Sequence, residues 1–124
     1  MDTKYWLSDP EDHDFPAAKD FLELVFPSAV AEDLTKRLRA SETITRKAKD
    51  ILRASRLPLL DQDNVHVQSN LEKIKNKKKL SPVLLVAGET LIIADGYHRL
   101  CAIYFLSEDL DVPCRLIHPD EIEK

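Results

Sequence analysis

The sequence predicts an α+β fold, in which a mixed sheet with packed helices follows two amphipathic helices. Two observations support this prediction. Apolar residues recur at helical spacing in the first third of the chain, and continuous apolar runs alternate with helix-like segments from Lys47 onward. The chain has 124 residues, 44% of them hydrophobic and 32% charged, a balance typical of one globular domain over residues 1–124.

The first predicted helix covers residues 15–26, with Pro16 in its first turn and Pro27 at its end. Its apolar face is predicted to contain Phe21, Leu22, Val25 and Phe26. Ser28 can cap a second helix over residues 29–40. The stripe of that helix is predicted to contain Val30, Leu34 and Leu38. We expect these two helices to form an N-terminal extension, residues 1–46, that covers one face of a core over residues 47–118.

The core begins with "AKDILRASRLPLL", which is short, has an apolar centre and ends near Pro58, so it is consistent with a strand or a helix-to-strand connection. "DQDN" offers turn and capping residues before a helix over residues 65–76. "PVLLVAG" and "TLIIADG" are predicted to be strands covered on both faces. A helix over residues 97–108 and a strand over residues 112–117 complete the order ααβαββαβ.

Composition disfavours several classes of function. The net charge of −4 argues against a general nucleic-acid-binding protein, and the five lysines between Lys73 and Lys79 are better explained as the end of a helix. No apolar run approaches the ~20 residues that span a bilayer, and the acidic N-terminus does not resemble a signal peptide, so we expect a cytoplasmic protein. Cys101 and Cys114 are expected to be reduced and buried.

The segment "IIADGYHRLCAIYFL" contains the clearest candidate site. A helix starting near Tyr97 places His98 and Arg99 in its first turn, where the helix dipole disfavours cations by about 0.3–1 kcal/mol each. Gly96 lets a ligand approach the backbone, and Arg99, His98 and free N–H groups could together bind a phosphate. Equally, Asp95 could only cap the helix, and the two cations could face solvent or pair with nearby carboxylates.

An ordered series of motifs adds to this reading. "ILRASRLPLLD", "VHVQSNLEKI", "SPVLLVAG", "ADGYHRLCAIYFL" and "VPCRLI" follow one another from Lys47 to Ile117. The series resembles the ParB/sulfiredoxin superfamily, which implies a ParB/sulfiredoxin-like mixed sheet over this part of the chain. The resemblance also implies that a nucleoside triphosphate, ATP or CTP with Mg²⁺, binds with its phosphates at the start of the "GYHR" helix.

The resemblance implies roles for particular residues. His98 and Arg99 match the family's phosphate-binding histidine and arginine, next to the backbone of Gly96. Further phosphate contacts are implied for residues upstream, where Arg53 is placed in the first strand and the helix supplies His66, Ser69 and Lys73.

Departures from the family narrow the expected function. Tyr97 stands where sulfiredoxins have their nucleophilic cysteine, so sulfinic-acid reduction is not expected, and Cys101 is expected to be a buried thiol with a raised pKa. ParB proteins continue into DNA-binding and dimerisation regions that are not expected here. Some free-serine kinases of the superfamily have an Asp-Gly-His sequence before their arginine, which "DGYHR" resembles.

Two functional hypotheses remain open. The protein could be an enzyme of phosphoryl transfer or nucleotide hydrolysis, with Asp95 or Glu89 as the base. It could instead be a non-catalytic module in which the nucleotide controls binding of a protein partner to the two N-terminal helices. A DNA-associated role is disfavoured by the acidic balance. The phosphate hypothesis further predicts that the fold does not depend on Arg99.

Overall fold

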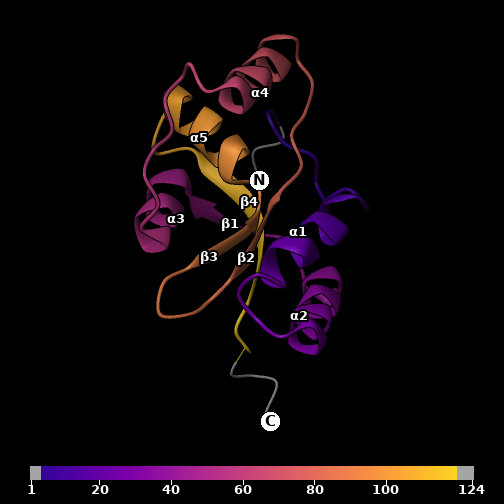
Figure 1. Cartoon of the computed structure of the whole chain (residues 1–124). Coiled ribbons are helices and arrows are strands. Elements are labelled where there is room, and N and C mark those ends of the chain that lie inside the picture. Colours follow the sequence, from indigo (N-terminus) through magenta and orange to yellow (C-terminus); the bar gives the residue numbers. More distant parts are fainter. Residues whose placement is uncertain (1–3, 120–124) are drawn as a thin grey trace.

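The computed structural model in Figure 1 describes residues 4–119 and is an α+β fold with a mixed sheet, as predicted. Within this range lie five helices and four strands. They are α1 (Asp14–Leu22), α2 (Ser28–Ala40), β1 (Ile44–Lys47), α3 (Ala48–Ser55), α4 (Val65–Lys75), β2 (Val83–Val86), β3 (Ile92–Asp95), α5 (Tyr97–Leu106) and β4 (Asp111–Ile117). None of the helices in the described range is long and apolar enough to cross a membrane.

The sheet has the strand order β1-β4-β2-β3. β4 pairs antiparallel with β1 and parallel with β2, while β2 and β3 form an antiparallel hairpin. Cys114 of β4 lies between Ile44 of β1 and Val83 of β2. Because β3 and β4 are joined through α5, the start of this helix lies directly after the end of β3.

Alternation along β2 explains the layers of the fold. All four residues of this strand are buried, and successive side chains point to opposite faces of the sheet. Leu84 and Val86 belong to the apolar cluster of α1 and α2, whereas Val83 and Leu85 belong to the cluster that contains residues of α3 and α5. α4 lies outside α5 and packs on it through Val67 (Figure 1).

The strand expected between residues 47 and 60 is a helix, and this part of the prediction was wrong. Ala48, Ile51 and Ser55 are buried at the spacing of one helical face, so "AKDILRAS" forms α3 against the sheet. The strand is instead the preceding β1, which crosses the expected boundary between residues 46 and 47. Its Ile44 and Thr45 are β-branched residues, which favour a strand.

The N-terminal helices cover one face of the sheet, although their details differ from the prediction. Leu34 and Leu38 of α2 are fully buried as expected. α1 ends at Leu22, and its buried apolar residues are Phe15, Ala18 and Leu22, while Phe21 and Val25 are exposed.

The predicted helix caps have different outcomes. Ser28 does not cap α2, because its hydroxyl donates to Glu23 instead. Asn64 does cap α4, since its side chain accepts hydrogen bonds from the N–H groups of His66 and Val67. Of these two polar residues at helix starts, only Asn64 therefore caps its helix.

The segment before α1 is anchored to the core by Trp6. The Trp6 side chain is 1% exposed and belongs to the cluster beneath α3 and α5. Trp6 forms a parallel bridge with Leu80, with Leu7 N–H donating to Leu80 O and Leu80 N–H donating to Tyr5 O. This pairing holds the segment that leads to α1 beside the loop that precedes β2.

Candidate functional site

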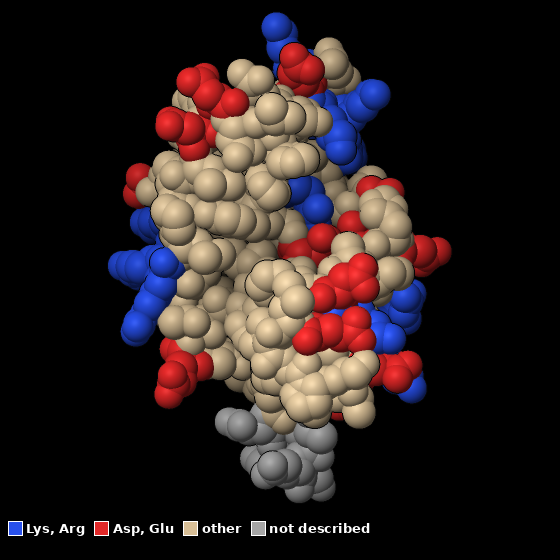
Figure 2. All heavy atoms as spheres, viewed as in Figure 1, with Lys and Arg blue, Asp and Glu red and all other residues tan. Residues whose placement is uncertain are grey.

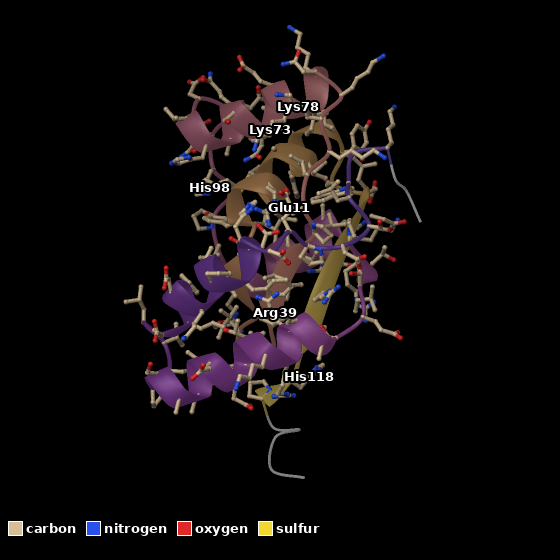
Figure 3. The ribbon with its side chains drawn as sticks, turned by 90° about the vertical axis from the view of Figure 1, so that its right-hand side faces the viewer. Glu11, Arg39, Lys73, Lys78, His98 and His118 are labelled. Carbon is tan, nitrogen blue, oxygen red and sulfur yellow. The ribbon has the colours of Figure 1, made fainter. Side chains whose placement is uncertain are left out.

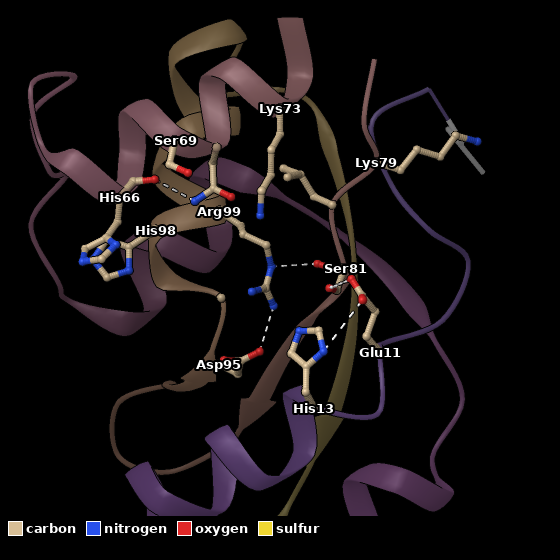
Figure 4. Close-up of a pocket in the computed structure, with 13 residues that line it drawn as sticks. Glu11, His13, His66, Ser69, Lys73, Lys79, Ser81, Asp95, His98 and Arg99 are labelled. Atoms are coloured by element: carbon tan, nitrogen blue, oxygen red, sulfur yellow. Dashed lines mark hydrogen bonds and ion pairs between the residues drawn. The ribbon is translucent and has the colours of Figure 1, made fainter. Parts of the chain in front are cut away.

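A polar pocket of about 400 Å³ lies where α4, the start of α5, the end of β3 and the segment before α1 meet (Figure 4). Figure 3 shows Lys73, His98 and Glu11 around this part of the molecule, with His118 at the opposite end. The pocket is lined by Glu11, His13, His66, Ser69, Asn70, Lys73, Lys79, Leu80, Ser81, Asp95, Gly96, His98 and Arg99. The structure thus brings together most of the site residues expected from the sequence.

Gly96 forms the turn from β3 into α5. Its φ of 108° is left-handed, a conformation that other residues rarely adopt. A Cβ atom at this position would lie 2.9 Å from Val83 Cβ, 3.0 Å from Arg99 Nη2, and closer still to Val83 Cγ1. Both the backbone angle and the packing against β2 therefore require glycine.

Arg99 is held by three acceptors within the protein. Its Nη2 lies 2.9 Å from Asp95 Oδ2 and donates to Pro82 O at 3.2 Å, and its Nε donates to Ser81 O at 2.9 Å. The side chain is only 16% exposed. These contacts contradict the expectation that the fold does not depend on Arg99. The reason is that the carbonyls before β2 come within reach of the guanidinium, which the helix-dipole argument did not consider.

Asp95 pairs with Arg99 and does not cap α5, so the capping prediction was wrong. Burial raises the pKa of the Asp95 carboxyl, and the net pKa stays above its ordinary value although the neighbouring Arg99 lowers it. Interaction with Asp14, which is 2% exposed, raises the pKa of Asp95 further. The interaction with Arg99 therefore only partly offsets the cost of burying the negative charge of Asp95 at the end of β3.

His98 and His66 form a pair at one end of the pocket. Their ring centroids are 4.7 Å apart with an angle of 55° between the ring planes, although the rings come from different helices. Burial lowers the pKa of His98, and the neighbouring His66 and Arg99 lower it further. The unliganded pocket thus favours a neutral imidazole at His98.

Lys73 is a cation of the pocket whose side chain has no partner among the described residues. Its side chain extends from α4 into the pocket in Figure 4, and it makes no hydrogen bond or ion pair with any residue in the described range. His66, Ser69 and Lys73 recur at i, i+3 and i+7, so they share the face of α4 that lines the pocket. Lys73 is thereby better placed than Arg99 to meet an incoming anion.

The opposite side of the pocket is acidic and comes from the segment before α1. Glu11 Oε1 accepts a hydrogen bond from Ser81 Oγ at 3.0 Å. His13 lies between two carboxylates, with Nδ1 3.8 Å from Glu11 Oε2 and Nε2 3.5 Å from Asp14 Oδ1. Figure 2 shows acidic side chains gathered over α1 and basic ones at the end of α4, on the two sides of this region. The pocket is therefore divided by charge.

Two predicted site residues lie away from the pocket. Arg53 is on the exposed side of α3, where its side chain is 85% exposed and lies 3.2 Å from Asp50. The position of Arg53 was inferred from a strand that does not form. Glu89 lies in the loop between β2 and β3, beside Gly88 and Leu91, and lines other surface hollows.

Six pocket residues were not anticipated from the sequence. They are Glu11, His13, Asn70, Lys79, Leu80 and Ser81. Asn70 belongs to the same helix face as His66, so the helical period could have identified it. The position of Glu11 and His13 depends on the pairing of Trp6 with Leu80, for which the only sequence signal was the apolar "YWL" in an otherwise polar segment.

The two cysteines are buried, as predicted. Burial raises the pKa of the Cys101 thiol, and it raises the pKa of Cys114 to about 11. Neither residue lines the pocket. Both thiols therefore behave as core residues, because a nucleophilic cysteine needs an accessible thiolate.

Comparison with known proteins gave no match, either to family models, to curated proteins or to solved structures. The described residues also contain no group of three or more His, Cys, Asp or Glu side chains that could hold a metal ion.

Proposed function

We propose that this protein binds a nucleoside triphosphate, ATP or CTP, with its phosphates in the pocket at the start of α5. The observation that carries the proposal is the convergence of Lys73, Ser69 and His66 from α4 with His98 and the Gly96 turn from α5. Ammonium, hydroxyl and imidazole groups together with helix-start N–H groups are suited to phosphate oxygens.

The polar lining of the pocket suits the phosphates of a nucleotide better than its base. Ligand pockets that enclose an aromatic ring are usually lined by apolar side chains. Here Leu80 is the one large apolar residue among the lining residues. We therefore expect the base to lie outside the pocket and to contribute little to selectivity among ATP, CTP and GTP.

A ParB/sulfiredoxin-like core is part of this proposal. The order of α4, the β2–β3 hairpin, the "GYHR" helix and β4 supports it, as does the convergence of His66, Ser69, His98 and Arg99. The segment aligned with the family's first strand forms α3, so the support comes from residues 65–117.

Mg²⁺ would accompany the nucleotide. Because the described residues offer no cluster of metal ligands, the ion would be held mainly by phosphate oxygens and water, as is common for Mg²⁺ in nucleotide sites. The ion would neutralise phosphate charge next to the acidic side of the pocket.

Phosphoryl transfer requires a catalytic base in the pocket, whereas simple nucleotide binding does not. Glu89 lies away from the pocket. The carboxylate of Asp95 is engaged by Arg99 at 2.9 Å, so it is not free to accept a proton from a substrate. These two positions favour the non-catalytic alternative over the enzyme with Asp95 or Glu89 as its base.

A calorimetric titration with ATP, CTP and GTP, with and without Mg²⁺, tests the proposal. We expect all three to bind with dissociation constants within about tenfold of one another, since the base makes few contacts, and about 1.4 kcal/mol corresponds to tenfold. Phosphate release measured in the same samples distinguishes turnover from binding. Absence of binding by all three nucleotides would refute the proposal.

A protein partner at the N-terminal helices is a second element of the proposal. Phe21 in the last turn of α1 and Leu24 and Val25 just after this helix are 42%, 84% and 51% exposed, which is unusual for three large apolar residues so close in sequence. Substitution of Leu24 by Asp should weaken capture of such a partner while nucleotide binding is retained, and equal capture by both proteins would exclude this surface.

A further inference from the structure

The His66–His98 pair lies at the end of the pocket where positive charge is least compensated. Besides His66 and His98, the basic side chains of the pocket are His13, Lys73, Lys79 and Arg99, and its acids are Glu11 and Asp95. Asp95 pairs with Arg99, while Glu11 accepts from Ser81 and lies near His13 on the other side. No carboxylate in the described range makes an ion pair or hydrogen bond with His66 or His98.

The geometry makes protonation of both rings unfavourable in the unliganded pocket. Two imidazolium ions with centroids 4.7 Å apart would repel each other, and Arg99 follows His98 directly in the chain. Tyr97, whose ring centroid lies 5.7 Å from that of His98, brings no negative charge, because a tyrosine hydroxyl stays protonated in the range where histidine titrates and burial raises its pKa further. The neutral state of His98 thus follows from the arrangement of its neighbours.

A bound oxyanion would place negative charge next to the two imidazole rings, whose charged neighbours are otherwise positive. A divalent anion beside the rings would attract a proton to the imidazole and would accept a charge-assisted hydrogen bond from it. We infer that the His66–His98 pair takes up a proton when a divalent oxyanion enters the pocket, so that anion binding and protonation are coupled. This inference rests on the proposed phosphate site and specifies how that site responds to pH.

Nuclear magnetic resonance titration with sulfate tests the coupling. Sulfate keeps its two charges across the range in which histidine titrates, so any pH dependence belongs to the protein. The chain has four histidines, and their imidazole signals can be assigned from single substitutions to Asn. We expect saturating sulfate to raise the titration midpoint of His98 by about one pH unit or more, the usual effect of an opposite charge nearby.

His118 provides the internal control, because it lies at the opposite end of the molecule (Figure 3). Its midpoint should not move with sulfate. His66→Asn removes the neighbouring imidazole, so it should raise the His98 midpoint without sulfate and reduce the sulfate-induced shift. A second control is Lys75→Ala, a lysine of α4 that does not line the pocket, which should leave the shift unchanged.

The possible outcomes separate this inference from the proposed function. If sulfate perturbs the signals of Ser69, Lys73 and Gly96 but the His98 midpoint stays fixed, the coupling is refuted while the phosphate site stands. If no signal responds to sulfate, the coupling is refuted, and the nucleotide titration alone decides on the phosphate site. If the midpoint shifts but ATP does not displace sulfate, the coupling holds and the nucleotide assignment fails.

Discussion

The guanidinium of Arg99 joins the ends of two strands, because Nη2 lies 2.9 Å from Asp95 Oδ2 at the end of β3 while Nε donates to Ser81 O just before β2. Arg99→Ala should therefore lower the free energy of unfolding by about 3 kcal/mol, as expected for removal of one partner from a largely buried pair. Urea denaturation measures this loss.

Arg53→Ala is the matched control for Arg99→Ala. Arg53 also pairs with an aspartate, Asp50 at 3.2 Å, but its side chain is 85% exposed. Its removal should change the free energy of unfolding by less than about 0.5 kcal/mol. Equal stability of the two variants would mean that the Arg99 contacts do not support the fold.

Gly96→Ala should also destabilise the protein, for reasons of backbone and packing. A left-handed residue with a Cβ costs about 1–2 kcal/mol, and overpacking against Val83 costs about 1–3 kcal/mol. Gly88→Ala is the control, since a Cβ there would meet only Thr90 O at 3.1 Å and Ile92 Cδ1 at 3.9 Å. A larger loss for Gly88→Ala in thermal unfolding would contradict the assigned geometry.

The pH dependence of stability should reveal the burial of Asp95. Because the pKa of Asp95 is raised in the folded state, its stabilising contribution is present below the ordinary aspartate value and is lost as pH rises through the raised pKa. Asp95→Asn replaces the carboxyl with an amide that does not ionise, so the variant does not lose this stability as pH rises. The difference in free energy of unfolding between the variant and the unmodified protein should therefore change in favour of the variant as pH rises from about 4 upward.

Asp109→Asn should change the pH dependence of stability in the opposite direction. Hydrogen bonding to Lys49 lowers the pKa of Asp109, so its contribution is present above the ordinary value and is lost on acidification. Urea denaturation at a series of pH values compares the two variants. A falling advantage of Asp95→Asn with rising pH would show that Arg99 outweighs burial at Asp95.

Lys73→Ala should weaken nucleotide binding without weakening the fold. The ammonium group has no partner within the described residues, so a bound phosphate would be its main contact. Loss of one hydrogen bond to a charged group costs about 1.5–3 kcal/mol, or about tenfold to more than a hundredfold in affinity for ATP. Lys75→Ala removes the same charge from α4 outside the pocket, and calorimetry should show a much smaller effect.

Sequence patterns predicted the positions of site residues correctly where one helix, or one strand-to-helix turn, fixes those positions. His66, Ser69 and Lys73 share a face because α4 is a helix, and Gly96, His98 and Arg99 follow from a strand that ends where a helix begins. Patterns did not reveal contacts between distant segments. The partners of Arg99 at residues 81 and 82 depend on how β2 lies beside the start of α5.

Short elements were the other source of error. α3 has only eight residues, and in so short a segment an apolar centre is compatible with either a strand or a helix. Its packing against the sheet decides between them, and Arg53 consequently lies on an exposed helix surface. Glu89 was placed near the site by its position in the sequence, but the hairpin carries it away from the pocket.

Trp6 is the only tryptophan of the chain, and its pairing with Leu80 positions the acidic side of the pocket. Its indole fluorescence can therefore report whether that side is assembled, separately from the helical content seen by circular dichroism. During refolding, the fluorescence change should lag behind helix formation, because joining residues so far apart in sequence incurs a loop-closure entropy that α4 does not. Coincident fluorescence and dichroism phases in stopped-flow measurements would show instead that the N-terminal segment docks together with the helices.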